Sequence, residues 1–302
     1  MRVQAHRALL PDGRRWHFQH GPIDLVIGAE GDDGAALAAA HAAAWQRFET
    51  VLAELVAELP LLRRRVMGPC PLQGPIARRM WWACRPFHSQ FITPMAAVAG
   101  AVAQEIIAFY DRPGIARAWV NNGGDIALHV ADGESLNVGV VADISRRAPE
   151  TDASFAITSA MPVRGIATSG WRGRSFSLGI ADSVTILATT AAQADAAATI
   201  VANAVDVDDP RIVRRPADTL KDDTDLGDIP VTVDVPPLPA DLVRAALARG
   251  RRRALDLQRD GLIHSALLVC QRHVERVEPV PTELDIRVDP DTAPRRVGSV
   301  FA

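Results

Sequence analysis

The chain has 302 residues, a net charge of -3, 48% hydrophobic residues and 23% charged residues. This composition is that of a globular protein and excludes disordered and fibrous classes. The slightly acidic balance argues against a nucleic-acid-binding protein, which needs a concentrated basic surface. Three cysteines without CxxC spacing predict neither a zinc site nor a disulfide framework, which is typical of a cytoplasmic protein.

The N-terminal 20 residues contain no apolar segment of signal-peptide length, so we expect no export. The longest stretch of low charge, 91–103, is too short to cross a bilayer and is interrupted by Pro94 and Gly100. We therefore expect a cytoplasmic protein without a membrane span.

Hydrophobic spacing and turn residues predict the elements of the N-terminal two thirds. Residues 60–90, rich in Pro and Arg, are expected to be irregular. Helices are expected over 35–59, where Pro60 is the stop, over 93–110 and over 190–204. Strands are expected as a pair within 14–30 and then over 115–121, 126–130, 136–143, 154–158, 164–169 and 182–188.

The C-terminal third begins with an acidic, Pro-rich stretch, 206–240, that is expected to be an extended connection. Residues 239–302 are expected to form a helix, a strand over 262–269 and an irregular tail after Pro279. Because the strand runs come in antiparallel-looking pairs, we predict an α+β class of mixed sheets packed with helices. The expected organisation is a single large domain over 1–302, and the Ala-rich helices leave a homodimer plausible.

Two features allow more than one interpretation. Trp81 and Trp82 stand among arginines and either line the mouth of a ligand site or cover the edge of the core. Asp195 and Thr199 are four residues apart, so on a helix both side chains share one face and could bind a hard cation through oxygen. The alternative is an Asp that stabilises the helix dipole and a Thr that hydrogen-bonds back to its own helix.

Three stretches combine glycines or small residues with polar groups. They are NNGGDI at 121–126, RGIATSGWRGRSFSLGIADS at 164–183 and ADAAAT at 194–199. Glycines let a phosphate or a ring approach the main chain, whose N–H groups bind anions. In this order, and after the helix PMAAVAGAVAQEI, the three stretches resemble the ApbE superfamily, most closely its uncharacterised, leaderless cytoplasmic branch. The resemblance covers about residues 60–205.

The resemblance implies an ApbE-like (T-fold-like) fold and a site for FAD and Mg2+. It implies Mg2+ ligands at Asp195 and Thr199, with FAD between the motif segments. The residues expected to contact or border the flavin nucleotide are Asn122, Gly123, Gly124, Asp125, Thr168, Ser169 and Gly170. The implied chemistry is metal-assisted attack by a protein Thr hydroxyl on the FAD pyrophosphate, which delivers FMN to an acceptor protein and releases AMP.

The sequence departs from the transferases of this superfamily at three places. Ala99 stands where they carry a Lys, and Gln104 stands where they carry an Asp. The stretch 175–179 has no nearby His where they carry one. Because the Lys and the His would serve nucleotide binding and proton transfer, their absence weakens the case for ordinary flavin transfer. His88 and His129 are candidate replacements, although a structural role is the simpler interpretation of each.

Three functions are therefore compatible with the sequence, and no catalytic residue is assigned. The first is an Mg2+-dependent enzyme that transfers FMN from FAD or cleaves its pyrophosphate. The second is a non-catalytic binder of a flavin- or pterin-type cofactor, or an accessory factor in cofactor or one-carbon metabolism. The third is a scaffold that kept the fold and lost its ligand site.

Overall fold

The computed structural model describes residues 4–140 and 153–279. Most strands belong to one large sheet, and two short hairpins stand apart from it. The strands are β1 (His6–Leu9), β2 (Trp16–His20), β3 (Ile23–Glu30), β4 (Arg117–Asn122), β5 (Asp125–Val130), β6 (Ser135–Val140), β7 (Ala153–Thr158), β8 (Gly165–Ser169), β9 (Ser183–Ala188), β10 (Val213–Pro216), β11 (Pro230–Asp234), β12 (Ser265–Cys270) and β13 (His273–Val277).

The helical elements are α1 (Gly34–Ala57), α2 (Leu59–Leu62), α3 (Pro75–Cys84), α4 (Val98–Ile107), α5 (Ala191–Ala204) and α6 (Ala240–Arg259). Short 3-10 turns flank them: η1 (Arg85–Phe87), η2 (Pro94–Ala97), η3 (Ala108–Tyr110) and η4 (Ala217–Thr219). Side chains cap three of these N-termini. Asp33 caps α1, Thr93 caps η2 and Thr190 caps α5.

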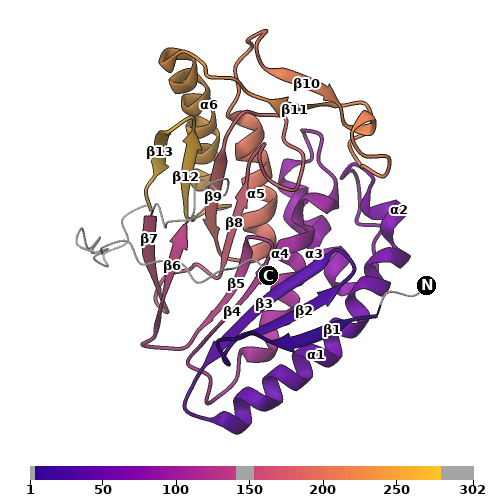
Figure 1. The fold of residues 1–302 in the computed structure, drawn as a ribbon, viewed down its shortest axis with the longest axis vertical. Helices are drawn as coiled ribbons and strands as arrows, with labels where there is room; N and C mark the ends of the chain where they lie inside the picture. The colour runs from indigo at the N-terminus through magenta and orange to yellow at the C-terminus, as the bar shows by residue number, and fades with distance from the viewer. Residues whose placement is uncertain (1–3, 141–152, 280–302) are drawn as a thin grey trace.

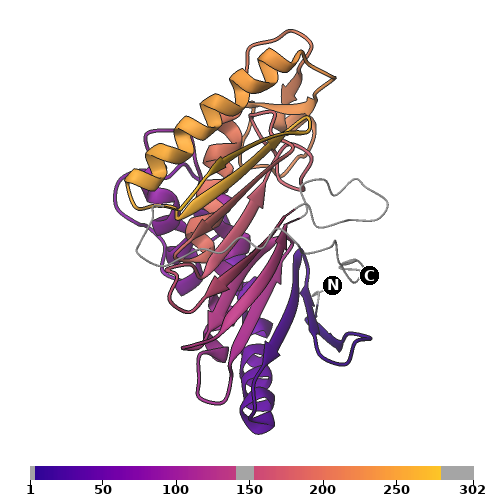
Figure 2. The same ribbon diagram turned by 90° about the vertical axis from the view of Figure 1, so that its left-hand side faces the viewer.

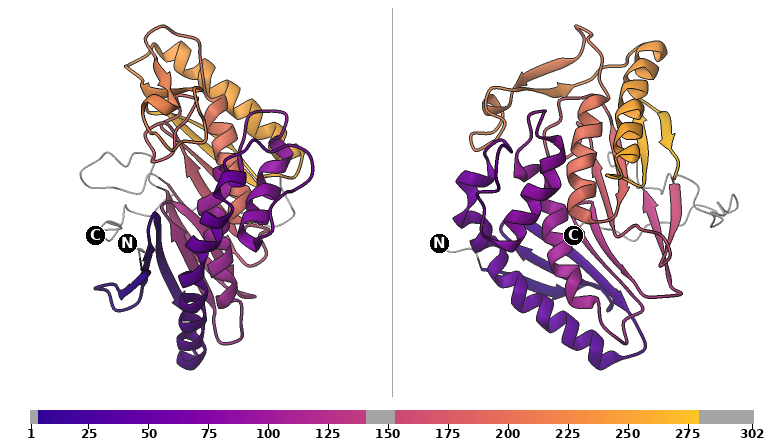
Figure 3. Two further views of the ribbon diagram at one scale, coloured as in Figure 1. Left: turned by 90° about the vertical axis from the view of Figure 1, so that its right-hand side faces the viewer. Right: turned by 180° about the vertical axis from the view of Figure 1, so that it is seen from behind.

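The large sheet has nine strands in the order β1-β2-β3-β4-β5-β8-β9-β12-β13, and its neighbours pair antiparallel (Figure 1). The helices α4, α5 and α6 lie on one face of this sheet, as the view from behind shows (Figure 3). Seen from the side, the sheet runs along the molecule, with α1 at one end and α6 at the other (Figure 2). The predicted α+β class is confirmed.

Two hydrophobic clusters cover the two faces of the sheet. Ala127 and Ala167 belong to the main cluster, which packs under the helices. Their chain neighbours Leu128 and Ile166 belong to a second cluster on the opposite face, together with side chains from the β6–β7 hairpin. The main cluster joins residues from Phe18 to Val277. The single domain expected over the whole chain stays a prediction.

The shortest strand pairing in the large sheet is at its centre, between β5 and β8. Only Ile126 with Ile166 and Ala127 with Gly165 are in register there, whereas β4 and β5 pair over six positions. The two strands therefore separate at the end that carries Asp125. This gap is where the candidate site lies.

The irregular structure predicted for 60–90 is wrong in its second half, where helix α3 forms. Its buried residues are Ile76, Ala77, Met80, Trp81 and Cys84, a helical spacing that the surrounding Pro and Arg residues hide. Trp81 is 3% exposed and packs in the core, whereas Trp82 is 57% exposed. The core-edge interpretation therefore fits Trp81. Pro60 does not end a helix at 59 but lies in the first turn of α2.

The stretch 206–240 is not a plain extended connection, because it contains the two-stranded hairpin β10–β11 and the turn η4. Strand β1 at one edge of the large sheet and strand β13 at the other were not predicted. Both are short edge strands, for which sequence signals are weakest. The irregular tail expected after Pro279 lies outside the described residues.

Candidate functional site

The NNGGDI stretch forms the tight turn between β4 and β5. Gly123 and Gly124 have φ angles of +65° and +113°, which other residues rarely adopt. Asn121 Oδ1 accepts a hydrogen bond from the Gly124 N–H at 2.8 Å and fixes the turn. Asn122 is buried and donates through Nδ2 to the Ala99 carbonyl at 3.1 Å, so the turn is tied to the N-terminal end of α4.

The TSG segment lies beside this turn, at the end of β8. The Thr168 N–H donates to Asp125 Oδ1 at 3.2 Å, so a carboxylate takes the place of a main-chain partner where the strands separate. The Thr168 hydroxyl is 2.9 Å from the Thr185 hydroxyl on β9. Ser169 ends β8, and Gly170 follows it in close contact with the main chain, since a Cβ there would lie 2.3 Å from the Asp182 carbonyl oxygen.

The third motif, on α5, reaches the same place from behind the sheet. Asp195 Oδ2 accepts a hydrogen bond from the Gly100 N–H at 2.9 Å, in the first turn of α4. Thr199 lies one helical turn further along α5 and is partly buried, on the same side as Asp195. The helix-dipole interpretation of Asp195 is incomplete, because its partner is the N-terminus of another helix rather than of its own.

The carboxyl groups of Asp125 and Asp195 lie close enough to affect each other. Burial raises the pKa of Asp125 to about 7, although the Thr168 N–H and the Arg174 charge oppose this. Burial also raises the pKa of Asp195, and the charge of Asp125 raises it further. Hydrogen bonds from the main-chain N–H groups of Gly100 and Ala99 lower this pKa, but by less. A divalent cation would supply the positive charge that this carboxyl pair lacks.

The residues present fit a hard cation in chemistry but do not form a complete cage. Asp195 and Thr199 offer oxygen ligands of the kind that Mg2+ binds, and Mg2+ usually keeps several waters or substrate oxygens. Within 4–140 and 153–279, no three His, Cys, Asp or Glu side chains are grouped so that they could hold a metal ion. Any cation here would therefore depend on hydroxyl, main-chain and ligand oxygens.

Two further elements reach this region that the sequence did not point to. Arg174, in the loop between β8 and β9, lies against Gly123, where an added Cβ would be 2.2 Å from its Nη2. Asp225, from the β10–β11 connection, accepts a hydrogen bond from the Thr93 hydroxyl. Burial raises the pKa of the Cys84 thiol, and the charges of Asp195 and Asp225 raise it further, so these groups are neighbours. The only signal for Arg174 was its place in a Gly-Arg-Ser stretch.

The candidate replacements for the missing Lys and His lie elsewhere. His88 Nδ1 is 3.0 Å from the Arg85 carbonyl oxygen, and His129 Nε2 is 3.2 Å from that of Ile115. Both contacts agree with the structural interpretation. Gln104 Oε1 accepts a hydrogen bond from the Ala192 N–H at 3.3 Å, which links α4 to the start of α5.

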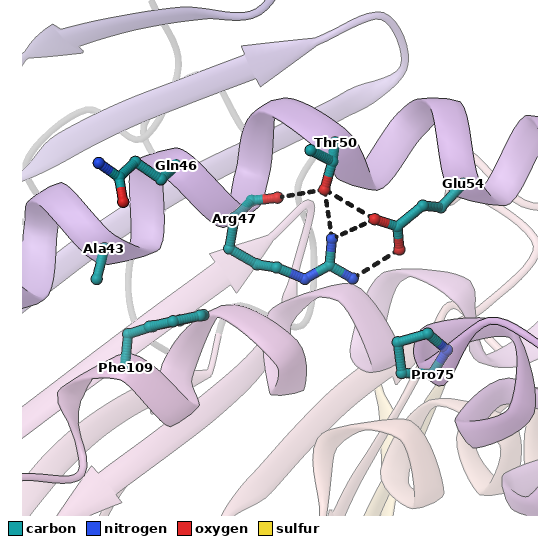
Figure 4. A pocket seen from close by; sticks show the side chains of 7 residues that line it. All are labelled: Ala43, Gln46, Arg47, Thr50, Glu54, Pro75 and Phe109. Carbon is teal, nitrogen blue, oxygen red and sulfur yellow. Dashed lines mark hydrogen bonds and ion pairs between the residues drawn. The ribbon is translucent and has the colours of Figure 1, made fainter.

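Two cavities on the helical side do not contain the motif residues. One, of about 640 Å³, is an open groove between α1, α3 and η3, with Arg47, Thr50 and Glu54 at its wall (Figure 4). The other, of about 360 Å³, lies between α3 and the start of α5. The motif residues instead meet where the ends of β5 and β8 contact α4 and α5. No helix of the described ranges is both long and apolar enough to span a membrane.

Behind the groove, Glu105 on α4 joins two arginines. Its carboxylate accepts hydrogen bonds from Arg47 and Arg79, both at 2.8 Å. Burial alone would raise the pKa of Glu105, but the two arginines outweigh it and lower the pKa below the ordinary value of 4.5. The charged form of Glu105 therefore stabilises the fold, fully above pH 4.5 and less as the pH falls below it.

We expect Glu105→Gln to lower the free energy of unfolding by about 2 kcal/mol at pH 7, since it removes the carboxylate charge that Arg47 and Arg79 share. Arg79 then has no ion-pair partner in the described part of the chain, while Arg47 keeps Glu54. Urea unfolding at pH 7 and at pH 3.5 measures this loss. Glu49→Gln is the control, because Glu49 is exposed on α1. A loss that is equal at both pH values would contradict the role of the Glu105 charge.

The sequence model of the family described as "AbpE bacteria" matches residues 7–278. With its antiparallel sheet covered by helices and its three converging motifs, the chain belongs to this family. It is 37% identical over 163 residues to a UPF0280 protein of Methanothrix thermoacetophila, covering 53% of this chain and 65% of the relative. It is 32% identical over 193 residues to a UPF0280 protein of Methanosarcina acetivorans, covering 63% of this chain and 72% of that relative.

The chain spans about half to two thirds of the length of several curated relatives that it matches. Among solved structures, the apo form of the flavinyl transferase ApbE of Pseudomonas stutzeri is 11% identical, with a TM-score of 0.43, and covers 92% of this chain and 94% of its own. The ApbE protein of Thermotoga maritima is 17% identical, with a TM-score of 0.36, and covers 83% and 78%.

Proposed function

We propose that this protein is an Mg2+-dependent enzyme that acts on the pyrophosphate of FAD. The observation that carries the proposal is the convergence of three segments far apart in the chain. Asp125 in the glycine turn accepts a hydrogen bond from the Thr168 N–H, and its charge raises the pKa of Asp195. Asp195 in turn accepts a hydrogen bond from the Gly100 N–H in the first turn of α4. The resemblance of the three motifs to the ApbE superfamily, whose transferases use FAD, supports flavin as the ligand class.

In this proposal each motif has a separate task. The turn at 122–125 and the segment 168–170 bind the flavin nucleotide, because their glycines let it approach main-chain N–H groups. Asp195 and Thr199 hold Mg2+, which neutralises the charge that develops on the phosphate. Asn122 keeps the turn against α4 through the Ala99 carbonyl.

The proposed reaction is a phosphoryl transfer. An acceptor hydroxyl forms a bond to the phosphorus of the FMN half while the phosphoanhydride bond breaks. AMP leaves with the electron pair, and the hydroxyl proton passes to solvent. When the acceptor is a Thr of a protein, the product is a flavinylated protein; when it is water, the product is free FMN.

A non-catalytic binder of a flavin- or pterin-type cofactor, or an accessory factor in cofactor or one-carbon metabolism, is the second candidate. Two observations favour it. Position 99 carries Ala, whose side chain holds no charge, and Gln104 is engaged with the Ala192 N–H. The Lys and the Asp that the transferases carry at these two positions are therefore missing.

Incubation of the purified protein with FAD and MgCl2 tests both candidates. Release of FMN and AMP supports the enzyme, whereas bound flavin without release supports the binder. Magnesium removal with EDTA should stop the release. A protein that stays colourless and shows no FAD-induced rise in melting temperature would exclude both.

A cytoplasmic location belongs to the same proposal. Cys70, Cys84 and Cys270 are all free thiols, which is usual in a reducing compartment. The acceptor protein and a homodimer formed through the Ala-rich helices stay predictions.

A further inference from the structure

Arg174 occupies an unusual position on the glycine turn. It follows β8 in the loop that leads to β9, and its guanidinium lies over Gly123. A Cβ on Gly123 would be 2.2 Å from Arg174 Nη2 and 3.1 Å from Cζ. Glycine at 123 therefore does more than permit the positive φ of the turn, because it also leaves room for this side chain.

The Arg174 side chain is exposed, and its guanidinium has no bonding partner in the described part of the chain. No hydrogen bond or ion pair there uses it, although its charge lowers the pKa of Asp125 nearby. Arg172, two residues earlier, behaves differently. Its Nε is 3.1 Å from Asp182 Oδ1, and its guanidinium stacks on the Trp171 ring at 4.5 Å.

The site needs a cation at this place if it binds a phosphate. When they are ionised, Asp125 and Asp195 repel a phosphate. Ala99 provides no charge where the transferases of the superfamily carry a Lys. A guanidinium presents a planar fork of donors that fits a phosphate through two hydrogen bonds, so an arginine beside the turn can meet this need.

We infer that Arg174 is the phosphate-binding side chain of this site and that it holds the pyrophosphate of a nucleotide over the Asn122–Asp125 turn. This inference rests on the proposed function, and it names the residue that makes the site select phosphorylated ligands. Arg174, which lies in a different part of the chain from position 99, supplies the positive charge that the absent Lys would provide.

Binding of ADP and of adenosine in MgCl2, measured by calorimetry, tests the inference. The wild-type protein should bind ADP more tightly than adenosine. Arg174→Ala should weaken ADP binding by about tenfold or more, the effect of losing a charge-assisted hydrogen bond, and should leave adenosine binding unchanged. Arg174→Lys should restore part of the ADP affinity. Arg172→Ala, which removes an equal charge from the same loop, should change ADP binding less than threefold.

The possible failures are distinguishable. If the wild type binds neither FAD nor ADP, the proposed function falls and the inference falls with it. If the wild type binds FAD and ADP but Arg174→Ala binds ADP equally well, only the inference is overturned. An equal loss of ADP and adenosine would also overturn it, because Arg174 would then shape the site rather than hold a phosphate. The melting temperature without ligand should stay unchanged, since the side chain is exposed.

Discussion

Replacing Asp195 by asparagine is expected to abolish the increase in FAD binding and turnover that Mg2+ causes in the wild type. The amide keeps the shape of the side chain and can still accept the hydrogen bond from the Gly100 N–H, which spans 2.9 Å in the wild type. It lacks the negative charge that draws a hard cation. Loss of an outer-shell partner already lowers metal affinity by about 10- to 100-fold, so loss of a direct ligand should lower it further. Titration of Mg2+ in the presence of FAD measures the change.

The same substitution should not weaken the metal-free protein. Burial and the Asp125 charge raise the pKa of Asp195, so its charged form costs stability that increases as the pH rises. In EDTA at pH 8, Asp195→Asn should melt no lower than the wild type, and any advantage should shrink at lower pH. Asp241→Asn on α6 is the control, because it removes one exposed helical charge elsewhere.

Thr199→Val should act in the same direction with a smaller effect, because it removes a neutral oxygen and keeps the volume of the side chain. If Asp195→Asn retains the wild-type magnesium dependence, Asp195 is not a metal ligand. Its bond to Gly100 would then be its whole role, which is to join α5 to the start of α4.

The strongly patterned elements of the fold could be predicted from the sequence. The strand β4 alternates between buried and half-buried residues, β9 is a short apolar run of strand length, and α5 is an Ala-rich run of helical length. Helix α3 was missed because proline and arginine obscure its apolar face. The edge strands β1 and β13 were missed because an edge strand buries little and needs little hydrophobic pattern.

At the candidate site, the sequence singled out three motifs, but it did not predict which of their atoms meet. Asp125 and Thr168 are 43 residues apart, and their contact depends on how β5 and β8 separate at the centre of the sheet. The contact of Arg174 with Gly123 depends on a loop path that no local pattern determines. Asp225 reaches Thr93 from a stretch whose acidic composition predicted only a connection.

A glycine at position 100 is what lets the two site helices approach each other. A Cβ there would lie 2.3 Å from the Ala191 carbonyl oxygen and 2.9 Å from the Asp195 Cβ. The first of these contacts is with main chain, which cannot rotate away as a side chain can. The short distance between α4 and α5 also places the Gly100 N–H against the Asp195 carboxylate.

We expect Gly100→Ala to lower the free energy of unfolding by about 3 kcal/mol, because one added methyl forces the two helices apart. Gly34→Ala is the matched control: nothing lies within 4 Å of an added Cβ there, and the residue begins α1. That change should be neutral or slightly stabilising, since alanine is the better helix former. Urea unfolding of the three proteins measures the difference. If the two variants unfold at the same urea concentration, Gly100 does not set the spacing between α4 and α5. If Gly100→Ala is less stable but FAD binding still depends on Mg2+, this spacing serves the fold and not the site.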